Sequence, residues 1–135
     1  MNIELKPKEF RRLLDMVYIG NWVLNSTRGT DRIPDFDQLE SYLFSLCDSV
    51  GMESLTSKSG GISAPSAAYR EGGIHEAIMN YEDAVFFGIL ADELAHRDLA
   101  AFGDAGDEDA HMVRAEEYLS EFQANGLDNV SVDME

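Results

Sequence analysis

Apolar residues recur every three or four positions over most of this chain, and no other feature constrains its fold as strongly. The spacing predicts amphipathic helices over residues 7–27, 34–50, 73–102 and 107–124. Pro7 and Pro34 stand in the first turn of two of these helices, where a missing backbone N–H costs no hydrogen bond. We therefore expect a mainly α fold, a single-domain bundle of four or five helices over residues 1–135.

Local signals indicate where these helices begin, end or break. Gly51 follows the second helix, at the position of a left-handed C-terminal cap. Acidic residues 107–109 occupy the first turn of the last helix, where the helix dipole favours negative charge. Asn80 is expected to interrupt the third helix, because asparagine is a frequent N-terminal cap.

Three segments lack the helical spacing. Residues 54–73, SLTSKSGGISAPSAAYREGG, are rich in Ser, Gly and Ala, and a connection of this length is typical of a mobile or functional loop. The GxxxxGK[ST] order of a phosphate-binding loop is absent from it. Apolar and polar residues alternate at 3–5 and at 130–132. A short two-stranded pairing of the N- and C-terminal segments is therefore a further expectation.

Charge is distributed unevenly along the chain, whose net charge is −16. Residues 1–70 contain 9 acidic and 8 basic side chains, whereas residues 71–135 contain 17 and 2. Such a field repels nucleic acid and anionic membrane surfaces, and the longest apolar run has only eight residues. We expect neither of these as a partner. A basic protein is the expected partner, and the chain is also expected to form a homo-oligomer, most simply a homodimer.

The residues that support covalent catalysis are scarce. Cys47 is the only cysteine, so no internal disulfide can form and a cytoplasmic location is expected. No G-x-S-x-G nucleophile motif is present. The leading interpretation is thus a small non-enzymatic interaction or regulatory protein with an acidic C-terminal half. Inhibitor, immunity-type and nucleic-acid-mimicking roles all fit such a charge pattern.

One alternative is a metal-binding protein or metal-dependent enzyme. Glu93 and His96 have the Glu-x-x-His spacing of metal ligands in helical bundles, and His111 on the next helix would complete a three-ligand site for a divalent transition metal. Arg97 follows Glu93 by four residues, so an ordinary Glu–Arg pair is the competing interpretation. The chain has no second Glu-x-x-His, and we favour an ordinary helix that needs no cofactor.

A second alternative is a small-ligand pocket at the end of the first helix. Asn21 and Asn25 fall in the middle of its apolar stripe, and Arg28 follows on the same side. A polar side chain facing a core requires hydrogen-bond partners, which either a ligand or the protein itself can supply. The three residues are therefore candidate ligand-binding residues, with a purely structural network as the other interpretation.

Overall fold

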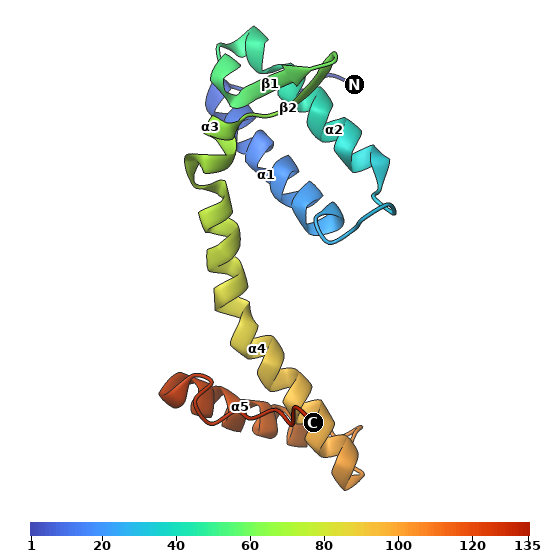
Figure 1. Ribbon diagram of the computed structural model, residues 1–135, viewed down its shortest axis with the longest axis vertical. Helices are drawn as coiled ribbons and strands as arrows, with labels where there is room; N and C mark the ends of the chain where they lie inside the picture. The colour runs from blue at the N-terminus through green and yellow to red at the C-terminus, as the bar shows by residue number, and fades with distance from the viewer. The chain divides into compact units, whose positions relative to one another are not determined.

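The computed structural model describes all 135 residues and confirms the mainly α fold. Its long helices are α1 (Pro7–Asn25), α2 (Pro34–Ser45), α4 (His75–Phe102) and α5 (Glu108–Asn125) (Figure 1). Short helical turns form η1 (Cys47–Val50), η2 (Glu53–Leu55), α3 (Ala67–Tyr69) and η3 (Arg70–Ile74). None of the helices has the length and hydropathy needed to cross a membrane.

Contacts within the chain define two compact units, Met1–Ile78 and Met79–Glu135. We call them the N-terminal unit and the C-terminal unit. Helix α4 begins in the first of these and continues in the second. The organisation as a single domain stays a prediction.

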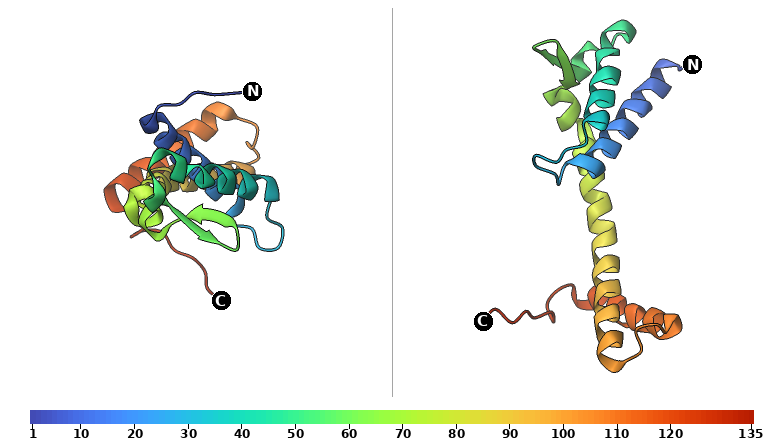
Figure 2. Two further views of the ribbon diagram at one scale, coloured as in Figure 1. Left: turned by 90° about the horizontal axis from the view of Figure 1, so that it is seen from above. Right: turned by 90° about the vertical axis from the view of Figure 1, so that its right-hand side faces the viewer.

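The N-terminal unit is built on α1 and α2, which lie side by side (Figure 2). Three core residues of α1 recur every fourth position, namely Phe10, Leu14 and Tyr18. They pack with Phe44 and Cys47, both of which are completely buried. Burial raises the pKa of the Cys47 thiol, so this side chain behaves as a small core residue. The second helix is shorter than predicted, because α2 ends at Ser45 and Gly51, at φ 72°, caps the separate turn η1.

Residues 54–73 have a defined conformation that their composition did not suggest. Strands β1 (Thr56–Ser59) and β2 (Ile62–Pro65) form an antiparallel hairpin in contact with α2. The turn is Gly60–Gly61, with φ of 57° and 77°, a conformation that glycine adopts at little cost. Tyr69 then enters the core, 1% exposed, and its hydroxyl donates to Asp15 over 2.9 Å.

Two further local predictions are wrong. Helix α4 runs through Asn80 without a break, because the residues around it are good helix formers and no glycine or proline stops the helix there. Residues 1–6 and 126–135 form no strand, so the terminal segments do not pair. Two alternating apolar residues are too few to specify a strand, and the sheet forms within 54–73 instead.

The C-terminal unit is a helical hairpin in which α5 folds back across α4 (Figures 1 and 2). Gly103, at φ 80°, ends α4, and the Asp107 side chain caps α5 by accepting from the backbone N–H of Ala110. The α4 side of the core is narrow, with Ala91, Ala95 and Leu99 buried. Phe122 of α5 is 4% exposed and is the one buried aromatic side chain of this unit.

Candidate functional site

The two basic residues of the C-terminal unit are held by its own carboxylates. Asp98 accepts from the guanidinium groups of Arg97 and Arg114 and, at 2.5 Å, from the Tyr118 hydroxyl. Arg114 also pairs with Glu117 at 2.7 Å. Neither arginine contacts any other carboxylate. Both arginines of this unit are therefore neutralised by carboxylates at the contact between α4 and α5.

Most carboxylates of this hairpin consequently have no cationic side chain beside them. The C-terminal unit contains 15 acidic and 2 basic residues, whereas the N-terminal unit contains 11 and 8. Apart from Asp98 and Glu117, 13 acidic side chains of the C-terminal unit have no lysine or arginine partner. We call this unit the acidic hairpin. Its charge creates a negative potential that attracts cations and basic surfaces.

The Asp98 contacts predict how the acidic hairpin responds to acid. Hydrogen bonds from Tyr118 and Arg97 lower the pKa of Asp98 to about 2. Because the folded pKa lies below the usual value of about 4, this carboxylate stabilises the fold fully above pH 4. Its contribution is lost as the pH falls through about 2. We expect urea unfolding of an Asp98→Asn variant to be less sensitive to pH between about 4 and 2 than unfolding of the parent protein. An identical pH dependence would contradict this assignment.

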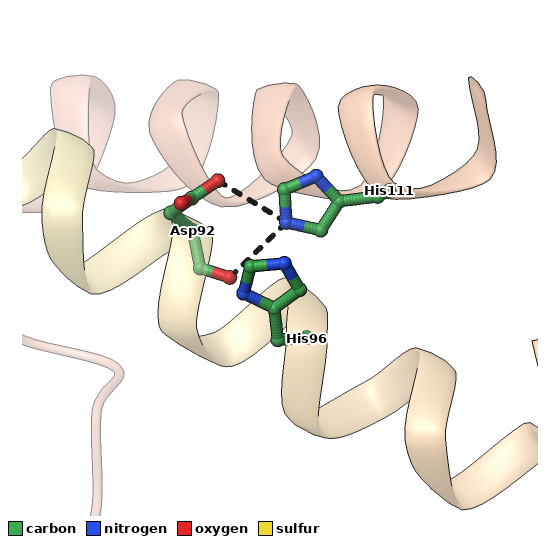
Figure 3. A group of neighbouring side chains, drawn as sticks. All are labelled: Asp92, His96 and His111. Atoms are coloured by element: carbon green, nitrogen blue, oxygen red, sulfur yellow. Dashed lines mark hydrogen bonds and ion pairs between the residues drawn. The ribbon is translucent and has the colours of Figure 1, made fainter. Parts of the chain in front are cut away.

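Three metal-ligating side chains converge elsewhere on the same hairpin (Figure 3). Asp92 and His96 are four residues apart on α4, and His111 comes from the first turns of α5. The two imidazole rings stack with centroids 4.0 Å apart, and His111 Nε2 lies 3.1 Å from Asp92 Oδ1. One ligand atom from each residue falls within 4.8 Å of the others. Of the predicted metal ligands, His96 and His111 are thus brought together.

Glu93, the third predicted metal ligand, and Arg97, its predicted ion-pair partner, are not part of that cluster. Glu93 is exposed and is not one of the three converging donors. Arg97 contacts Asp98 and Tyr118, so the expected Glu93–Arg97 pair does not form. The third histidine, His75, belongs to the N-terminal unit, where its Nε2 lies 2.6 Å from the Tyr18 hydroxyl.

The two buried side-chain amides of α1, Asn25 and Asn21, form hydrogen bonds with other groups of the protein. Asn25 is completely buried; its side chain donates to Asn21 Oδ1 and to the Ile33 carbonyl and accepts from the Ile33 N–H. Asn21 donates to Asp37, which Arg32 also binds. These hydrogen bonds lower the pKa of Asp37. The network joins the end of α1 to the beginning of α2 and accounts for the burial of both amides.

Arg28 lies outside this network. Its side chain donates to the Leu24 carbonyl and to Asp31. A pocket of about 370 Å³ is lined by Asn21 but by neither Asn25 nor Arg28. The structure therefore does not place the three predicted ligand-binding residues around one pocket, and ligand binding at Asn21 stays a prediction.

Asp92 and Asp98 are the residues that the sequence analysis missed. The signal for Asp92 was its four-residue spacing from His96, which places both side chains on one face of a helix. The Asp98 cluster had no local signal, since Arg114 and Tyr118 follow it by 16 and 20 residues.

Comparison with other proteins identifies no relative. The chain matches no protein-family model, no curated protein sequence and no solved structure. Its function must therefore be inferred from its own residues.

Proposed function

We propose that this is a non-enzymatic interaction protein whose acidic hairpin binds a basic protein partner. The observation that carries the proposal is the set of 13 acidic side chains without a lysine or arginine partner, on a unit whose only two arginines are bound to Asp98 and Glu117. Like charges concentrated on a small unit destabilise it by mutual repulsion. Lysine and arginine side chains of a partner would relieve this repulsion on binding.

Exposed apolar side chains on the same hairpin support the proposal. Large residues of α4 and α5 that remain open to solvent are Met79, Tyr81, Phe86, Ile89, Phe102, Met112 and Val113. Protein interfaces combine apolar contacts with complementary charge, which steers association and selects the partner. The acidic hairpin offers both kinds of contact.

Two charge variants with the same net charge test this proposal. The first replaces Glu82, Glu93 and Glu116 of the acidic hairpin with glutamine. The second makes the same change at Glu4, Glu53 and Glu71 of the N-terminal unit. All six side chains are exposed and none forms an ion pair. We expect the parent protein and the second variant to capture the same basic protein from cell extract, and the first variant to recover at least about fivefold less, a loss of about 1 kcal/mol.

Equal recovery by both variants would contradict the proposal, because net charge alone would then explain the binding. Failure of the parent protein to capture any basic protein at low salt would contradict it as well. Circular dichroism of both variants serves as the control for folding, since surface substitutions of this kind change stability by only about 0.5 kcal/mol.

The proposal includes a cytoplasmic location and self-association as a homodimer. The single buried cysteine is consistent with a reducing compartment.

An apolar groove of about 950 Å³ in the N-terminal unit, lined in part by Leu13, Met16 and Leu43, supports self-association through this unit. Sedimentation velocity over a range of protein concentrations tests for the dimer.

A further inference from the structure

The three side chains that converge on the acidic hairpin form a donor set typical of transition metals. Two imidazole nitrogens and one carboxylate oxygen suit Zn²⁺, Co²⁺, Ni²⁺ or Cu²⁺, whereas Mg²⁺ and Ca²⁺ prefer oxygen ligands alone. Asp92 and His96 lie one helical turn apart on α4, and His111 reaches them from α5 (Figure 3). All three donors lie in the acidic hairpin, so no residue from the N-terminal unit is needed to complete the site.

The distances between the donors are close to those that a metal requires. In a tetrahedral zinc site, ligand atoms about 2.0–2.2 Å from the metal lie about 3.4 Å from one another. His111 Nε2 and Asp92 Oδ1 are already 3.1 Å apart. The remaining separations, at most 4.8 Å, shorten by rotation of the Asp92 and His96 side chains, both of which are exposed. The backbone can therefore stay in place when a metal binds.

The surroundings leave room for further ligands. A pocket of about 250 Å³ is lined by His96, His111 and the 105–108 segment that leads into α5. Asp107 and Glu108 are among its lining residues. Water can thus take the fourth position that three protein ligands leave open.

The electrostatic field at the cluster favours a cation. The nearest basic residue along α4, Arg97, is bound to Asp98 and Tyr118, and Arg114 is bound to Asp98 and Glu117. Neither guanidinium pairs with Asp92. The other hairpin carboxylates that have no lysine or arginine partner add a negative potential around the site.

From this geometry we propose that Asp92, His96 and His111 bind one divalent transition-metal ion and thereby clamp α5 onto α4. The site is independent of the proposed partner: metal binding depends on three specific side chains, whereas the partner is attracted by the charge of the whole hairpin. A metal bound only to the folded hairpin also stabilises it, in proportion to the logarithm of the metal concentration relative to Kd.

Zinc titration of the chelator-treated, full-length protein tests the site. Isothermal titration calorimetry is expected to show one Zn²⁺ per chain, and Co²⁺ is expected to give visible absorption bands from nitrogen and oxygen ligands. His96→Gln, His111→Gln and Asp92→Asn should each raise the Kd for Zn²⁺ more than about tenfold, since removing even an outer-shell partner of a metal ligand costs about 10–100-fold. The increase in Tm caused by Zn²⁺ should disappear with the binding.

Glu93→Gln is the matched control, because it removes a neighbouring carboxylate from the same helix but none of the three donors. It should retain the parent Kd. Zinc binding that survives both histidine substitutions, or that exceeds one ion per chain without saturating, would overturn the proposal and show only general attraction of cations to an acidic surface. Loss of binding in Glu93→Gln with retention in Asp92→Asn would overturn the assignment of the ligands. His96 is exposed, so its substitution leaves the fold intact and keeps the test decisive.

Discussion

Phe122→Ala is expected to destabilise the acidic hairpin by about 3–5 kcal/mol. Phe122 is 4% exposed and packs against Phe87 and Tyr118, with ring centroids 5.4 and 6.1 Å away. The α4 side of this core contributes only alanines and Leu99 as buried residues. The substitution therefore leaves a cavity beside Phe87 and Tyr118, and α5 loses its main apolar contact with α4.

Urea unfolding followed by circular dichroism measures this loss, and hydrogen exchange locates it. Protection should decrease in α5 and in the part of α4 that faces it. Val113→Ala is the control, since Val113 lies on the same helix but is 58% exposed, and we expect a change of only about 0.5 kcal/mol. Equal effects of the two substitutions would show that α5 does not pack on α4 through Phe122.

Asn25→Ala should destabilise the N-terminal unit by about 2–3 kcal/mol, because it removes three hydrogen bonds from a completely buried position. The Ile33 N–H and the Asn21 side chain would lose a partner at the connection between α1 and α2. Water cannot replace the lost amide without entering the core.

Arg28→Ala provides the comparison for Asn25→Ala. The Arg28 guanidinium forms an exposed pair with Asp31, and such pairs contribute at most about 1 kcal/mol. Thermal or urea unfolding should separate the two variants clearly. A stability of Asn25→Ala equal to that of the parent protein would show that the amide is not kept for folding, and would favour the ligand-binding interpretation of Asn21 and Asn25.

The helices were predictable from the sequence because their apolar spacing is long and regular. α1, for example, repeats core residues at Phe10, Leu14 and Tyr18, and the structure places all three inside. The end of α4 at Gly103 also follows from a single residue. Asp107, expected within the first turn of the last helix, precedes α5 and caps it. The β1–β2 hairpin was missed because its strands are short and mostly polar, although the Gly60–Gly61 pair marks a turn of this kind.

The candidate site was only partly predictable, because it depends on how two helices pack. The 3.6-residue helical repeat predicts that His96 has a neighbour either three or four residues away, so the sequence alone did not distinguish Glu93 from Asp92. The structure places His111 beside Asp92 and thereby selects the latter. The same packing brings Arg114 and Tyr118 to Asp98. Most other carboxylates of the acidic hairpin are therefore left without a lysine or arginine partner.

The salt dependence of partner binding tests the central claim most directly. For the partner captured by the parent protein, Kd should be measured at ionic strengths from about 50 to 500 mM, over which the screening length falls from about 14 to 4 Å. If the acidic hairpin binds through its unpaired carboxylates, Kd should rise at least about tenfold over this range, and less steeply for the glutamine variant at Glu82, Glu93 and Glu116. A Kd that does not change with salt would contradict the account, because a contact governed by these charges must weaken when they are screened.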